Sequence, residues 1–176
     1  MVGGQFLDVE GAGELDLRRL HELKTGALIG ASVGCVVALV GPDGPATLPL
    51  RRFAAELGVV FQIVDDILDI TATDDQLGKP AGHDMVDGVY TLPVLRTLAD
   101  AGVAADELSD LLGSPLDAVV RDKALSIVRA GEGVAYSREV ASGYVRAAAD
   151  ACSSLPDNSA SAALRAAPHE LLDSVR

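Results

Sequence analysis

The segment FQIVDDILDI at residues 61–70 carries three aspartates in a run of otherwise mostly apolar residues. On a helix with about 100° per residue, the polar side chains of this segment fall within roughly 100° of arc. They are Gln62, Asp65, Asp66 and Asp69. The rest of the circumference is apolar, which is typical of a helix that is buried on most of its surface. The sequence therefore predicts a buried helix whose acidic stripe lines a cleft.

The aspartates of this helix lack a nearby counter-charge in the sequence. Residues 53–78 include six acidic residues and no basic one, so a cation from elsewhere must compensate them. Hard oxygen ligands at this spacing suit Mg²⁺, which binds a few carboxylates and shares the phosphates of a substrate. The pattern predicts a Mg²⁺ site that uses Asp65, Asp66 and Asp69. A solvated acidic stripe is the alternative interpretation.

Two lysines are candidate ligands for a phosphate group. Lys24 precedes Thr25 in the sequence KTG, at the start of a glycine-rich segment, and Lys79 lies in GKPAGHD. A lysine among small residues suits a phosphate that approaches the backbone closely. Neither short motif is specific by itself, and a solvated lysine is the alternative at both positions.

The apolar pattern is helical nearly throughout the chain, which predicts an all-α fold. Ala and Leu dominate, and alternating apolar runs are scarce. The expected helices are 14–40, 49–70, 92–100, 115–130, 133–153 and 159–175. Ser114 and Pro115 are expected as the N-cap and first residue of the fourth of these helices. The one long irregular piece is 71–90, and loops of this length in compact domains are typically functional.

Composition narrows the function classes. The chain has 176 residues, of which 49% are hydrophobic, so it can form one domain with a real core. Its net charge of −12 argues against binding to nucleic acid or to anionic lipid. Cys35 and Cys152 are too few for a disulfide framework, which favours a reducing compartment, and both are expected to be small core residues. The N-terminus lacks a signal-peptide pattern, so we expect a cytoplasmic protein.

Residues 25–41 form an uncharged run of 17 residues that includes Gly26, Gly30 and Gly34. A run of this length lies at the lower limit for a transmembrane helix. A buried helix whose glycine ridge lets a neighbour pack closely explains the same pattern with fewer assumptions. We therefore expect no transmembrane segment, with a membrane span as the alternative.

Five motifs in one order resemble the trans-isoprenyl (polyprenyl) diphosphate synthase family. They are GQFLD at 4–8, KTGALIGAS at 24–32, FQIVDDILD at 61–69, LGKPAGHD at 77–84 and YTLP at 90–93. The resemblance implies part of the isoprenoid synthase helical bundle. It assigns residues 1–155 to the C-terminal half of a polyprenyl synthase domain and residues 156–176 to a terminal helical tail.

The resemblance also implies an activity, the condensation of isopentenyl diphosphate with an allylic diphosphate, and Mg²⁺ as the cofactor. Asp65, Asp66 and Asp69 would form the second aspartate-rich motif of the family and bind the metal. Lys24 and Lys79 would hold the allylic diphosphate directly.

Further residues take their expected roles from the same resemblance. Thr25 and Gln62 would lie beside the allylic carbon and form the catalytic set with Lys24. Gln5 and Asp8 would line the cavity, where Gln5 would contact the diphosphate and Asp8 would assist the metals. Neutralisation of the diphosphate would let it leave, and the allylic cation would form in a dry cavity.

The chain departs from the family pattern at two points. It contains one aspartate-rich motif, where the family has two on facing helices, so the first-half helices are missing. Val89 stands where many relatives place a lysine near the diphosphate. Without the facing helices, much of the apolar cavity wall would be exposed, and such a patch marks an interaction surface or an aggregation hazard.

Several functions stay open on the sequence alone. The chain is expected to be a prenyltransferase that is incomplete in isolation and forms a homo- or hetero-oligomer with a synthase chain. The alternatives are a non-catalytic partner subunit of a full-length synthase and an inactive truncated remnant. A class I terpene cyclase fits the lysine positions less well. The retained aspartates favour an enzymatic origin, because a scaffold has no physical need for three neighbouring carboxylates.

Overall fold

The computed structural model describes residues 25–175, and all regular structure within this range is helical. The helices are α3 (Ala27–Val40), α4 (Thr47–Thr71), α5 (Asp74–Leu77), α6 (His83–Val86), α7 (Leu92–Ala99), α8 (Val103–Leu112), α9 (Ala118–Ala130), α10 (Gly133–Ala151) and α11 (Ser159–Asp173). The predicted all-α fold is confirmed. Three of the candidate site residues, Gln5, Asp8 and Lys24, lie outside the described residues.

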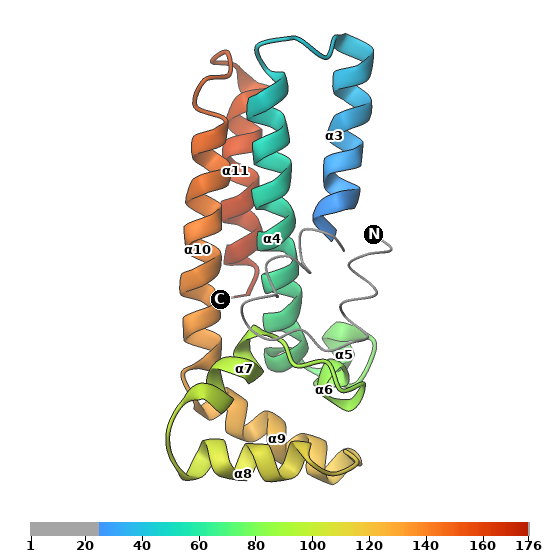
Figure 1. Ribbon diagram of the computed structural model, residues 1–176, viewed down its shortest axis with the longest axis vertical. Coiled ribbons are helices and arrows are strands. Elements are labelled where there is room, and N and C mark those ends of the chain that lie inside the picture. Colours follow the sequence, from blue (N-terminus) through green and yellow to red (C-terminus); the bar gives the residue numbers. More distant parts are fainter. Residues whose placement is uncertain (1–24, 176) are drawn as a thin grey trace.

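The long helices run side by side along the longest axis of the molecule, with α4 between α3 and α10 (Figure 1). Helix α11 packs against both α10 and α4. Helices α8 and α9 lie across the lower end of this bundle, and the short α5 and α6 lie near the same end (Figure 1). The end of α4 that carries the aspartates is therefore surrounded by the segments from residue 71 onward.

Helix α4 supplies more buried residues than any other described helix. Its apolar positions repeat at helical spacing and pack against α10, as in the contact of Val60, Ile63 and Ile67 with the cluster that includes Ala141 and Val145. All five of these side chains are at most 2% exposed. Because α4 is buried along most of its length, its polar side chains have fixed surroundings.

A second cluster joins the end of α4 to the lower helices. Ile70, Val94 and Val128 are buried together with Ala81 and Met85, which come from the segment predicted to be irregular. That segment contains the single-turn helices α5 and α6, so the expectation of an irregular 71–90 was wrong in detail. The buried side chains of Ala81 and Met85 pack this segment against the core, which explains why it has a defined structure.

The helix boundaries agree with the sequence for α4, α7, α10 and α11, and differ at two places. Helix α8 was not predicted, because it lies between Gly102 and Gly113 and buries only Ala105 and Leu108. Helix α9 begins at Ala118 rather than at residue 115.

The N-cap of α9 is Asp117, not Ser114. The Asp117 Oδ1 accepts hydrogen bonds from the backbone N–H groups of Val119 and Val120, both at 2.9 Å. Asp and Ser cap helices about equally well, so cap preference alone does not distinguish the two positions. The expectation of Pro115 as the first helical residue was therefore wrong.

Helix α3 is not the buried helix that its apolar sequence predicts. Leu28, Val36 and Leu39 are 55%, 52% and 87% exposed, and Cys35 is exposed as well. Cys152 is buried, so the prediction of two core cysteines holds only for that residue. Within residues 25–175, no helix is both long enough and apolar enough to cross a membrane.

Only one of the three glycines allows a close approach between the backbones of α3 and α4. An added Cβ at Gly58 of α4 would lie 2.5 Å from the Cα of Gly26, so the two backbones touch where α3 begins. By contrast, a Cβ at Gly30 or Gly34 would meet nothing within 4 Å. Close helix packing through small residues therefore applies to Gly26, and the other two glycines face open space.

Candidate diphosphate and metal site

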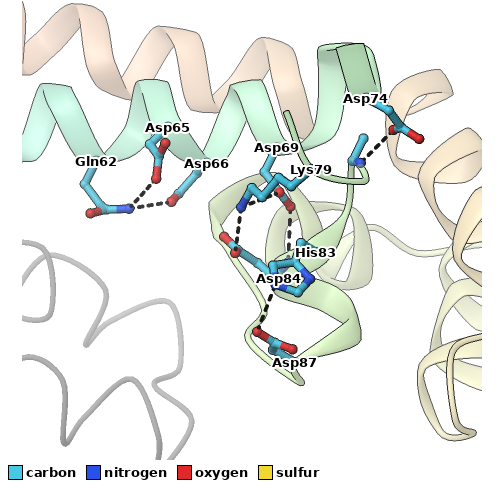
Figure 2. A network of polar contacts seen from close by, with 10 residues as sticks. Gln62, Asp65, Asp66, Asp69, Asp74, Lys79, His83, Asp84 and Asp87 are labelled. Atoms are coloured by element: carbon cyan, nitrogen blue, oxygen red, sulfur yellow. Dashed lines mark hydrogen bonds and ion pairs between the residues drawn. The ribbon is translucent and has the colours of Figure 1, made fainter. Parts of the chain in front are cut away.

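The polar stripe of α4 lies on one side of the helix, as the sequence predicts (Figure 2). Gln62, Asp66 and Asp69 are buried, at 6%, 2% and 4% exposure, whereas Asp65 is exposed. Buried carboxylates must be hydrogen-bonded or paired with a cation to stay charged. The partners of these side chains therefore define what the site can hold.

Gln62 links the start of α3 to the first two aspartates. The Thr25 hydroxyl donates to Gln62 Oε1 at 2.9 Å. The amide Nε2 of Gln62 donates to Asp66 Oδ1 at 3.1 Å and, more weakly, to Asp65 Oδ2 at 3.4 Å (Figure 2). The structure thus brings together Thr25 and Gln62, the two residues expected beside the reacting carbon. The bond from Thr25 leaves the amide oxygen of Gln62 oriented toward α3.

Asp69 is the centre of a second group of contacts. Lys79 Nζ lies 3.3 Å from Asp69 Oδ1 and 3.9 Å from Asp84 Oδ1. The backbone N–H of Asp84 donates to Asp69 Oδ2 at 3.3 Å, and the N–H of Gly82 donates to the Asp69 carbonyl at 2.7 Å. Figure 2 shows Lys79 between the two carboxylates. Lys79, from the segment after α4, is therefore the described cation that compensates the buried end of the stripe.

Asp84 was not assigned a role from the sequence, although it is the last residue of the motif LGKPAGHD. Its position in that motif was the available signal. Val89, which the family resemblance predicts to stand at a lysine position, donates its backbone N–H to the Asp84 carbonyl at 2.8 Å. Val89 is thus attached to the site through its backbone.

The loop that carries Lys79 is fixed at several points. Thr73 and Gln76 form a capping box at the start of α5, and Asp74 Oδ1 accepts from the N–H of Ala81 at 2.8 Å. Gly82 has φ +71°, and an added Cβ there would lie 3.0 Å from side-chain atoms of Leu125. Both the left-handed backbone and the close contact require glycine at this position.

The electrostatics of the site favour an additional cation. Burial and the nearby Asp69 raise the pKa of Asp84 from 3.8 to about 6, against the opposite effect of Lys79. Burial lowers the pKa of Lys79, but Asp69 and Asp84 outweigh that effect and raise its pKa above the usual 10.5. Lys79 is therefore protonated at neutral pH, and burial beside Asp69 destabilises the charged form of Asp84.

The carboxylate oxygens of the site fit a Mg²⁺ ion that is shared with a phosphate ligand. Within residues 25–175, no three His, Cys, Asp or Glu side chains are grouped so that they could hold a metal ion by themselves. Mg²⁺ usually binds one or two carboxylates and completes its octahedron with water and substrate phosphates. Asp65, Asp66 and Asp69 offer such carboxylate oxygens along one face, so the fit is to a metal shared with a phosphate ligand.

Comparison with known proteins identifies the family of this chain. The polyprenyl synthetase family model matches residues 1–127. The chain is 35% identical over 164 residues to nonaprenyl diphosphate synthase of Mycobacterium tuberculosis, covering 89% of this chain and 49% of that protein. It is 36% identical over 149 residues to heptaprenyl diphosphate synthase component 2 of Geobacillus stearothermophilus, covering 85% of this chain and 46% of that protein.

Among solved structures, the chain is similar to geranylgeranyl pyrophosphate synthase from Corynebacterium glutamicum complexed with calcium and isoprenyl diphosphate. The TM-score is 0.84 at 30% identity, and the match covers 99% of this chain and 56% of that one. The chain thus spans about half the length of the relatives it matches. With motifs, fold and these likenesses in agreement, the chain belongs to the polyprenyl synthetase family.

Proposed function

We propose that the chain supplies the second aspartate-rich half of a Mg²⁺-dependent prenyltransferase that condenses isopentenyl diphosphate with an allylic diphosphate. The observation that carries the proposal is the polar face of α4, which carries Gln62 and the three aspartates. Thr25 contacts it at Gln62, and Lys79 contacts it at Asp69. The names of the matched relatives, all prenyl diphosphate synthases, support the same reaction class. The proposed substrates are these two diphosphates.

The residues of this chain have separate tasks in the proposed reaction. Asp65, Asp66 and Asp69 would hold Mg²⁺, which neutralises the diphosphate as it leaves. Lys79 exchanges contact with Asp69 for diphosphate oxygens, since its side chain is 44% exposed and can move. The Gln62 carbonyl oxygen, oriented by Thr25, stabilises positive charge that develops on the allylic carbon.

We further propose that a second chain completes the active site in a homo- or hetero-oligomer. The matched relatives are about twice as long as this chain. The large exposed apolar side chains of α3 and α4 are Leu28, Val36, Leu39, Leu48 and Phe61. A surface of this kind is typical of an interface, and the name "component 2" of one relative supports a multi-component enzyme.

Substitution of Asp65 tests the proposed site. Asp65 is exposed, so Asp65→Ala leaves the core intact and removes one proposed metal ligand. We expect Mg²⁺-dependent binding of geranyl or farnesyl diphosphate, measured by calorimetry on the assembled complex, to be abolished. Asp75→Ala is the matched control, because Asp75 is an exposed aspartate of α5. Unchanged affinity in Asp65→Ala would contradict the assignment of Asp65 as a metal ligand.

A non-catalytic partner subunit is the second candidate function, and the exposed face of α3 is the observation that favours it. The two functions differ in a reconstitution assay. We expect little condensation by the isolated chain and substantial turnover when a chain carrying the first aspartate-rich motif is added. Turnover that persists in a complex with Asp65→Ala would support the partner function. Robust turnover by the isolated monomer would contradict the need for a second chain.

A further inference from the structure

The C-terminal end of α4 lies next to Asp69, and its carbonyl groups are satisfied from several directions. The last carbonyls of a helix lack partners within the helix. The Leu68 carbonyl accepts from the N–H of Ala72 at 2.9 Å, and the Asp69 carbonyl accepts from the N–H of Gly82. The next carbonyl, that of Ile70, accepts from a side chain on another helix.

That side chain is Arg129, in the last turn of α9. Its Nε donates to the Ile70 carbonyl at 2.6 Å, and its Nη2 lies 3.4 Å from the Ala72 carbonyl. One planar guanidinium thus connects the end of the helix to the turn that follows it. A cation at this position also interacts favourably with the negative end of the helix dipole.

A series of hydrogen bonds in residues 72–82 connects the position that Arg129 contacts to Asp69. Ile70 follows Asp69 directly, and Ala72 precedes the capping box that starts α5. From α5, Asp74 holds the N–H of Ala81, and the adjacent Gly82 returns to Asp69. The direction in which the chain leaves α4 therefore determines where the loop brings its lysine and aspartate to Asp69.

We propose that Arg129 is a positioning residue: it fixes the exit of the chain from α4 so that Lys79 and Asp84 meet Asp69. Its consequence for ligand binding rests on the proposed diphosphate site, whereas its effect on the loop does not. Lysine at this position would keep the charge and lose the fork that reaches two carbonyls together. Arg129→Lys should therefore preserve the role in part.

Hydrogen exchange on the full chain tests the effect on the loop. In Arg129→Ala, we expect the amides of Ala81, Gly82 and Asp84 to exchange at least tenfold faster, with a smaller increase in Arg129→Lys. The amides at the centre of α10 keep their wild-type rates, because the opening is local. Lys123→Ala is the matched control, since Lys123 is an exposed cation on the same helix and pairs with Glu107 of α8.

Binding of Mg²⁺ with inorganic pyrophosphate supplies the second measurement. We expect the apparent Kd to rise at least fivefold in Arg129→Ala, to recover in part in Arg129→Lys and to stay unchanged in Lys123→Ala. Unchanged loop exchange, or an equal acceleration in α10, would overturn the positioning role. If the wild-type chain and its complex both fail to bind pyrophosphate, the proposed function fails, while the exchange result still decides the role of Arg129.

Discussion

At the residue scale, the site depends on contacts between groups that are close in the fold and separated in the sequence. The stripe of Gln62, Asp65, Asp66 and Asp69 follows from helical spacing alone, so the sequence predicted it. The approach of Lys79 and Asp84 to Asp69 depends on how residues 71–84 fold back. No periodicity encodes that return, which is why Asp84 was missed.

The raised pKa of Asp84 predicts a pH-dependent stability in the metal-free chain. Its folded pKa of about 6 lies above its ordinary 3.8, so the folded state binds the proton more tightly. Wild-type stability should fall as the pH rises from about 4 to above 6. Asp84→Asn removes this pH-dependent loss. Its free energy of unfolding should exceed that of the wild type by roughly 3 kcal/mol at pH 8 and should equal it below pH 4. Urea unfolding in EDTA across this range measures the difference.

The control for this prediction is Asp75→Asn, which changes an exposed aspartate of α5. It should follow the wild-type curve closely. A wild-type stability that is flat between pH 4 and 7, or a destabilised Asp84→Asn at pH 8, would contradict the prediction.

At the element scale, the long amphipathic helices and the eight-residue α7 were predictable, whereas α8 and the exposure of α3 were not. Helices α4 and α10 have enough turns for their apolar periodicity to stand out. Helix α8 has ten residues, and only Ala105 and Leu108 are buried, so its signal is weak. The apolar run of α3 predicted burial, but burial depends on a neighbour, and within residues 25–175 the main neighbour is α4.

The contact of Gly26 with Gly58 gives a prediction about the packing of α3 on α4. Gly58→Ala should lower the free energy of unfolding by roughly 1–2 kcal/mol, because overpacking outweighs the gain in helix propensity. It should also weaken the nearby hydrogen bond from Thr25 to Gln62. Gly30→Ala is the opposite case, with open space around the new Cβ, and should raise stability by about 0.5–1 kcal/mol.

Urea denaturation of both variants measures these changes, and the amide resonance of the Gln62 side chain reports on the hydrogen bond. Equal stabilisation by the two substitutions would show that α3 does not pack closely on α4 at Gly26.

At the scale of the whole molecule, the distribution of apolar surface separates two sides. The α4–α10–α11 side is packed, and the outer side of α3 presents Val36 and Leu39 to solvent. Val36→Gln with Leu39→Gln should abolish concentration-dependent association of the chain, because it removes apolar area from the exposed face. Its unfolding midpoint should change little, since both side chains are more than half exposed.

Sedimentation velocity across a range of concentrations measures this association. Val119→Gln, which changes a 77% exposed valine on α9, is the control and should associate like the wild type. Cys35 provides an independent probe, because an interface over α3 should protect this exposed thiol from alkylation. Association that persists in the double variant with Cys35 still reactive would place the interface elsewhere.

The pairing of α4 with α10 also affects the order of events during folding. Val60 and Ile63 pack against residues more than seventy positions later, such as Ala141. Contacts of long sequence separation form late, because the entropy of closing the intervening loop must be lost first. A growing chain that has reached only α9 therefore holds α4 without its main partner. Synthesis of α10 is the step that allows Val60 and Ile63 of α4 to be buried in their cluster.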